Sequence, residues 1–305
     1  MARRSRARGK RNALTGRGAM KVYLAATFAW SWGIAATAFL SGWVAYPFIE
    51  GDTNALVMMI AFMCGPMVGA IIAALINGSF FQVLRLSFRP NIWWLRAWAF
   101  PVALVLLALA ISIVLPGASF SRPSEFLGRL LSPAQRAQLP QSPLVLDMIV
   151  IVQAVLVGAA VNSVLLLNEE LGWRGFMLSK LAAKSFWTRH LIIGLVWGGW
   201  HIPIIAAGHN YPGEPIAGPA VFTLFCMLLA PVIGYFSEQA RSVFGATIFH
   251  GTLNAVAPLS VLSLQGLGVF ERGVVGWPGI ALLLLCCLWL ALNPPAKAPS
   301  ADRTA

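Results

Sequence analysis

The chain has 305 residues, of which 58% are hydrophobic and only 10% are charged, and its mean hydropathy is +0.76. These values exclude a soluble globular domain and indicate a protein of the lipid bilayer. The formal net charge of +12 comes mainly from basic residues near the N-terminus.

Residues 1–21 form a basic arm directly before the first apolar stretch. Its Lys and Arg residues would attract any polyanion, including a nucleic acid. Directly before a span, however, such a cluster typically orients a membrane protein and lies on anionic headgroups, where each charge contributes about 1 kcal/mol. The first apolar stretch exceeds the roughly 7–15 residues of a signal-peptide core, so we expect it to stay as an anchor. We therefore expect a cytoplasmic arm, the lipid bilayer as a partner and no nucleic-acid partner.

Eight apolar stretches follow, each long enough to cross roughly 30 Å of hydrocarbon at about 1.5 Å per helical residue. They cover residues 22–45, 55–78, 92–115, 144–167, 189–209, 217–236, 243–263 and 276–293. Cytoplasmic loops carry the excess of Lys and Arg. With eight crossings, the only Lys and Arg residues outside the cytoplasm are Arg122, Arg129, Arg136 and Arg272. The sequence therefore predicts an all-α integral membrane protein with about eight transmembrane helices, in the cell (inner) membrane, with both termini cytoplasmic.

The chain divides into segments of different character. We expect a cytoplasmic arm (1–21), three spans with a Pro- and Ser-rich external loop (22–143), a core of four spans (144–263), a final span (264–293) and a cytoplasmic tail (294–305). The intramembrane acids and the histidines inside the spans all fall in the core. Chemistry is therefore expected between residues 144 and 263.

The core begins with an acidic motif, Glu-Glu-Leu-Gly-Trp-Arg-Gly, at residues 169–175. A lipid-facing charge at the bilayer centre costs roughly 2.5–3.5 kcal/mol, so acids kept there usually face a polar cavity that uses them. Glu170 and Arg174 are four residues apart and can pair on one helix face. Glu169 is rotated about 140° from Arg174 in a regular helix and is free to face a substrate or water. The alternative is a solvated helix end with an ordinary surface pair.

Two later stretches contribute His201 and the pair His250 and Asn254. His201 lies about 18 Å from the inner end of its span by helical rise, and glycines beside it admit another backbone or a substrate. His250 lies about 10 Å from the inner end of its own span, and Asn254 follows one turn later on the same face. Each could instead only bond a neighbouring helix. Their similar depth predicts that Glu169, His201 and His250 meet in the inner half of the membrane.

These motifs, in this order on separate helices, resemble the CAAX protease and bacteriocin-processing (CPBP) family of intramembrane endopeptidases, which includes the Rce1-type prenyl-protein proteases. Glu169, Glu170 and Arg174 match the first motif, Glu-Glu-x-x-x-Arg. His201 matches the second, Phe-x-x-x-His, with Trp in the Phe position, and His250 with Asn254 matches the third, His-x-x-x-Asn. The resemblance covers about residues 144–263.

The resemblance implies an intramembrane peptidase with an all-helical fold of eight spans. The six motif residues are then the expected catalytic residues: Glu169, Glu170, Arg174, His201, His250 and Asn254. Glu169 would be the base, with His201 holding the water, and His250 and Asn254 would donate to the oxyanion. Alternatively, Glu169, His201 and His250 would bind Zn²⁺ and leave a position for water.

The substrate would be a membrane-associated peptide or protein of CAAX or bacteriocin type, reached through a cavity open to the cytoplasm. Two other functions stay open from the residues alone. One is a non-catalytic scaffold or immunity protein, although the motif set is complete. The other is a proton-coupled transporter, because chains of Glu and His line such paths. The polar groups cluster on one side and no inverted repeat is visible, which argues against a transporter.

Overall fold

The computed structural model describes residues 2–48, 52–77 and 80–295, and the side chains of residues 2–17, 77 and 129–130 lie outside this description. The described chain is helical almost throughout. Its β structure is one antiparallel pair of two-residue strands, β1 (Ser119–Phe120) and β2 (Leu264–Gln265). Large apolar side chains also lie on the surface, including Leu75, Val164 and Leu285. Such a surface suits lipid, and the prediction of an all-α integral membrane protein is confirmed.

The N-terminal part contains α1 (Ala2–Leu40), α2 (Thr53–Met63), α3 (Gly65–Asn77), α4 (Phe80–Val83) and α5 (Ile92–Ile113). The backbone of the basic arm is already helical and continues into the first span, because Ala, Arg and Lys are good helix formers. The arm's side chains up to residue 17, and the tail from residue 296, lie outside the described residues. A proline at position 66 follows the break between α2 and α3, where it cannot continue an unbroken hydrogen-bond ladder.

The middle part contains two short helices in the Pro- and Ser-rich loop and one long composite helix. The short helices are α6 (Pro123–Leu130) and α7 (Pro133–Arg136). The composite helix comprises α8 (Pro143–Val152), η1 (Gln153–Gly158), α9 (Ala159–Glu170), η2 (Leu171–Met177) and α10 (Leu178–Lys180). Both η segments are π-helical. The C-terminal part contains α11 (Phe186–Ala206), α12 (Ala217–Gln239), α13 (Val243–Leu262) and α14 (Trp277–Leu292).

Each of the eight predicted apolar stretches coincides with helix. Among the described residues, five helices are long and apolar enough to cross a membrane: Gly18–Leu40, Thr53–Ile76, Ile92–Ile113, Pro143–Lys180 and Ala217–Gln239. The other three predicted spans correspond to α11, α13 and α14. Polar residues, including the site histidines, make α11 and α13 less apolar, and α14 has only 16 residues. The count of eight crossings stays a prediction.

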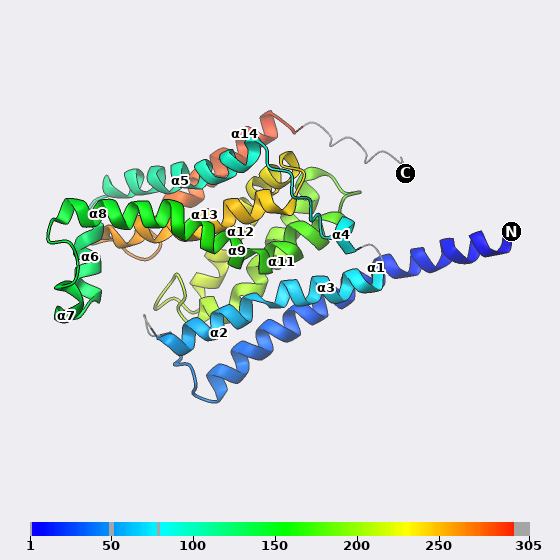
Figure 1. The fold of residues 1–305 in the computed structure, drawn as a ribbon, viewed down its shortest axis with the longest axis horizontal. Helices are drawn as coiled ribbons and strands as arrows, with labels where there is room; N and C mark the ends of the chain where they lie inside the picture. The colour runs from blue at the N-terminus through cyan, green and yellow to red at the C-terminus, as the bar shows by residue number, and fades with distance from the viewer. Residues whose placement is uncertain (1, 49–51, 78–79, 296–305) are drawn as a thin grey trace.

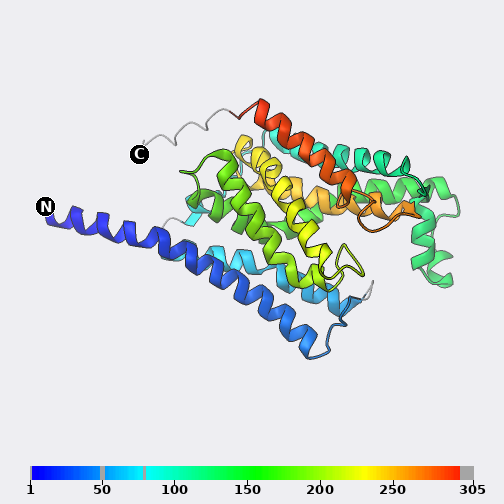
Figure 2. The same cartoon turned by 180° about the vertical axis from the view of Figure 1, so that it is seen from behind.

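Successive long helices run in alternating directions (Figures 1 and 2). The start of α1 and the end of α14 consequently lie on the same side of the bundle (Figure 1). The loop between α10 and α11 lies on this side as well, whereas α6 and α7 lie at the opposite end. In the interior, α13 packs between α9 and α5, and α11 packs along α12. This packing brings α9, α11 and α13 together around one buried cluster.

Candidate active site

Three helices that are distant in sequence deliver the predicted site residues to one buried cluster. Glu169 and Glu170 end α9, His201 lies on α11, and His250 lies on α13. Glu170 and Arg174 have no exposed surface, whereas Glu169, His201 and His250 are 3%, 8% and 5% exposed. Glu169, His201 and His250 are therefore slightly accessible to solvent, whereas the Glu170–Arg174 pair is completely buried.

Glu170 is the centre of a buried ion-pair network. Its Oε1 accepts hydrogen bonds from Arg174 Nη1 at 2.9 Å and from His250 Nδ1 at 2.8 Å. The predicted pair with Arg174 is therefore present. The bond to His250, across 80 residues of sequence, was not predicted. Because Nδ1 is used by Glu170, the other ring nitrogen of His250 is the one left for chemistry.

Glu169 is held by two tryptophans. Its Oε2 accepts hydrogen bonds from the indole N–H of Trp197 at 3.0 Å and from that of Trp173 at 3.4 Å. Sequence reasoning missed both donors. The i,i+4 spacing of Glu169 and Trp173 was a visible signal for one of them, whereas Trp197 was identified only as the Trp in the Phe position of the second motif. With Oε2 fixed by these bonds, no described hydrogen bond engages Oε1.

His201 is oriented by the backbone of its own helix. Its Nδ1 lies 2.9 Å from the carbonyl oxygen of Trp197, one turn earlier. A carbonyl only accepts, so Nδ1 carries the proton and Nε2 keeps its lone pair. The ring also packs edge-on against Trp200 and Phe222, with centroids 4.6 and 4.8 Å away. His201 thus has a fixed ring and one nitrogen able to accept from water.

Trp197 connects the separate parts of the cluster. In addition to its bonds with Glu169 and His201, its ring lies 5.1 Å from the ring of His250. The guanidinium of Arg174 lies over the same indole, 4.7 Å from its centroid. Substituting Trp for the Phe of the second motif therefore adds an N–H donor aimed at the first glutamate.

Asn254 differs from the other five predicted site residues. It follows His250 by one turn of α13, but its side chain is exposed and makes no hydrogen bond among those described. The structure therefore brings Glu169, Glu170, Arg174, His201 and His250 together and leaves Asn254 at the margin of the cluster.

Glycines permit the close approach of the site helices. A Cβ at Gly251, next to His250, would overlap the backbone of Asn162 and Ser163 on α9. A Cβ at Gly198 would lie 2.6 Å from Thr223 Cα on α12. The contact at Gly251 brings the helix with His250 against the helix with Glu170, since no side chain separates the two backbones.

The acidic motif is not a regular α-helix. Residues 171–177 form the π-helix η2, so the rotation of about 140° that a regular helix gives between Glu169 and Arg174 does not apply to this stretch. Short π-helical segments inside α-helices occur frequently at functional sites. Gly172 and Gly175 let η2 pack closely, because a Cβ would contact Pro66 and Leu84 respectively.

A metal requires several ligands that converge on one point. Among the residues that the structure describes, no three His, Cys, Asp or Glu side chains are arranged to hold a metal ion. In particular, Glu169 Oε2 already accepts hydrogen bonds from two indole N–H groups. The proposed zinc set of Glu169, His201 and His250 does not fit this arrangement.

Comparisons with known proteins agree with the motifs. Residues 146–256 match the family described as type II CAAX prenyl endopeptidase Rce1-like, and the matched range contains all six predicted site residues. No curated protein matches the chain. The family match covers under half of the chain and implies a peptidase. It confirms the resemblance inferred from the motifs: residues 146–256 are similar to the Rce1-like family of type II CAAX prenyl endopeptidases.

Proposed function

We propose that this protein is an intramembrane endopeptidase in which Glu169 and His201 activate a water molecule for peptide hydrolysis. The observation that carries the proposal is the double role of Trp197. Its indole donates to Glu169 and its carbonyl accepts from His201, so one residue fixes both groups. A carboxylate and an imidazole nitrogen held together in this way can bind and deprotonate water.

In both Glu169 and His201, one side-chain atom makes a hydrogen bond that fixes the side chain, and a second atom is available to contact water. Glu169 uses Oε2 for the indoles, so Oε1 takes the proton from water. His201 uses Nδ1 for the backbone, so Nε2 accepts a second hydrogen bond from the same water. The attacking oxygen is thereby oriented before the substrate carbonyl arrives, which lowers the entropic part of the barrier.

The oxyanion of the tetrahedral intermediate requires donors on the other side of the reacting carbonyl. His250 can donate a hydrogen bond from Nε2 when both ring nitrogens are protonated. The carboxylate of Glu170, bonded to Nδ1, then balances the positive charge of the ring. Asn254 lies one turn further on the same helix and supplies an amide N–H₂. Its side chain is exposed and is not engaged in a described hydrogen bond, so its amide is available to a substrate, and we assign these two residues to the oxyanion hole.

The rest of the chain then supports this site. We propose residues 144–263 as the catalytic core, residues 22–143 and 264–293 as its supporting spans, and residues 1–21 and 294–305 as the cytoplasmic arm and tail. The site lies about ten residues before the end of α10, on the side where α1 starts. With the basic arm in the cytoplasm, the substrate enters from the cytoplasm. The proposed substrate is a CAAX-type or bacteriocin-type peptide bound to the cell membrane.

Replacing Glu169 with Gln tests the proposal, because Gln keeps the shape and removes the base. Peptides released from membranes that contain the wild type or Glu169→Gln are compared by mass spectrometry. Peptides that depend on the wild type should disappear with Glu169→Gln. Glu214→Gln, the same change in the loop after α11, should leave cleavage unchanged. Full cleavage by a folded Glu169→Gln protein would overturn the mechanism.

Removing metal ions tests the metal-free form of the mechanism. The ligand set does not converge, so a chelator such as 1,10-phenanthroline should leave the cleavage rate within about twofold of the untreated protein. A non-chelating phenanthroline isomer is the control for binding of the aromatic molecule itself. Loss of cleavage with the chelator alone, reversed by added Zn²⁺, would contradict the metal-free mechanism.

A further inference from the structure

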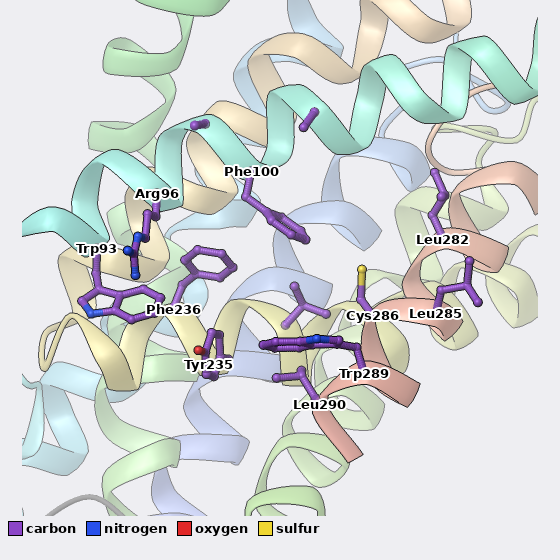
Figure 3. Close-up of a pocket in the computed structure, with 13 residues that line it drawn as sticks. Trp93, Arg96, Phe100, Tyr235, Phe236, Leu282, Leu285, Cys286, Trp289 and Leu290 are labelled. Carbon is purple, nitrogen blue, oxygen red and sulfur yellow. The ribbon is translucent and has the colours of Figure 1, made fainter. Parts of the chain in front are cut away.

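A separate cavity of about 710 Å³ lies between α5, α12 and α14 (Figure 3). None of the predicted site residues lines it. Its walls come from all three helices and are almost entirely apolar, with Phe100 from α5, Phe236 from α12, and Leu282 and Cys286 from α14 among them. Its volume falls within the roughly 300–1,000 Å³ range of small-molecule sites.

One end of the cavity carries a positive charge. Arg96 is the single charged residue among those lining it, and its guanidinium lies 4.5 Å from the ring centroid of Trp93. Arg96 is exposed, and no described carboxylate pairs with it. A guanidinium that no acid neutralises is well suited to bind a phosphate through two N–H groups.

The charged end lies near the ends of three helices. Arg96 is one turn from the start of α5, Tyr235 is one turn from the end of α12, and Trp289 is one turn from the end of α14. These three ends lie on the same side of the bundle (Figure 1). Trp and Tyr typically collect at the headgroup level. The apolar end, marked by Leu282 and Ala103, is farther from these helix ends and thus deeper in the hydrocarbon.

We propose that this cavity, called the groove below, binds an anionic phospholipid. The headgroup phosphate contacts Arg96, and one acyl chain lies between α5 and α14. Two features of the groove match this ligand in the same order. A cation with flanking aromatic rings occupies the boundary, and an apolar channel follows into the membrane. A soluble phosphorylated ligand would not need the channel, and an uncharged isoprenoid would not need Arg96.

Lipid binding to the full-length protein in detergent tests the proposal. Native mass spectrometry measures retention of phosphatidylglycerol and of phosphatidylcholine, and a thermal melt measures stabilisation by each lipid. For the wild type we expect tighter binding of phosphatidylglycerol. Arg96→Gln should weaken that binding by about tenfold or more, the loss expected for a charge-assisted phosphate contact. It should weaken phosphatidylcholine binding less, because the choline cation of that lipid already offsets the charge of its phosphate.

Two further variants separate the headgroup from the acyl chain. Arg89→Gln removes an exposed arginine just before α5 that does not line the groove, and it should bind both lipids as the wild type does. Ala103→Trp places a large ring on an exposed groove position, and it should weaken binding of both lipids.

Four results would each overturn the proposal. The first is equal phosphatidylglycerol binding by wild type and Arg96→Gln. The second is an equal loss with Arg89→Gln. The third is stabilisation by inorganic phosphate alone that matches the lipid, because the acyl chain would then be irrelevant. The fourth is displacement of the lipid by a farnesylated peptide at an equal concentration, because the groove would then hold substrate.

Discussion

At the scale of single residues, Trp197 determines the geometry of the candidate site. Its carbonyl accepts from His201, its indole N–H donates to Glu169, and its ring contacts Arg174 and His250. Four site residues thus take their positions from one side chain and its backbone. A Phe at this position would retain the ring contacts and lose the donor to Glu169.

Arg174 has a structural role that its removal should expose. Arg174→Ala leaves Glu170 fully buried with only His250 as a partner. Removing one partner of a buried pair costs on the order of 3 kcal/mol, so the melting temperature in detergent should fall clearly below that of Glu169→Gln. Lys184→Ala, which truncates an exposed basic residue, should change stability little.

A second substitution separates lost charge pairing from lost packing. In the double variant Glu170→Gln with Arg174→Ala, the uncompensated carboxylate is gone, so part of the lost stability should return. Equal melting temperatures for Arg174→Ala and the wild type would mean that the pair is solvated, contrary to its burial. No recovery in the double variant would assign the loss to packing of Arg174 on Trp197.

Only the site contacts between residues close together in the chain could be predicted from the sequence. The Glu170–Arg174 pair was predictable because four residues along a helix fix the distance between two side chains. The bond from Glu170 to His250 was not predictable, since it depends on how α9 packs against α13. The indole donor of Trp197 was missed for the same reason. The exposure of Asn254 also follows from tertiary packing, because helical spacing gives only the face that it shares with His250.

At the scale of elements, the apolar stretches predicted helices well and their internal irregularities poorly. Long apolar runs fix where helices lie, because every backbone polar group must be bonded inside a bilayer. The π-helical turns in the Pro143–Lys180 helix add a residue to a turn without changing this pattern, so hydropathy does not reveal them. Helix α13 is continuous, but its polar site residues lower its apolar character.

Gly251 sets the separation of α9 and α13. Gly251→Ala puts a methyl group against the backbone of Asn162 and Ser163, and overpacking of this kind costs about 1–3 kcal/mol. The two helices must separate, and His250 then moves away from Glu170. We expect a lower melting temperature together with a large loss of peptide cleavage.

The matched control for this variant is Gly33→Ala in α1. A Cβ at Gly33 meets no atom within 4 Å, so the same substitution adds no overlap and should slightly favour the helix. If Gly251→Ala keeps wild-type cleavage and stability, close contact between α9 and α13 is not required for the site. A loss of stability in Gly33→Ala as large as that in Gly251→Ala would contradict the packing argument too.

At the scale of the whole molecule, the alternating helix directions give the orientation of the site a physical test. The loop of residues 181–185 lies on the side where α1 starts, and the loop of residues 207–216 lies at the other end of α11. We predict that the first side faces the cytoplasm, because the basic arm starts there and Lys and Arg collect on the cytoplasmic side. Lys184 and Pro215, both exposed, therefore report on opposite faces of the membrane.

Single-cysteine variants at these positions should react from opposite sides. The background lacks the four native cysteines, of which Cys226 is fully buried and would be replaced with Ala to preserve packing. In intact cells, an impermeant thiol reagent should label Pro215→Cys and leave Lys184→Cys unlabelled until the membrane is opened. The reverse pattern would place the arm outside the cytoplasm and move substrate entry to the other face. Labelling of both variants in intact cells would mean that α11 does not cross the bilayer, and the depth argument that brings His201 to Glu169 would fail with it.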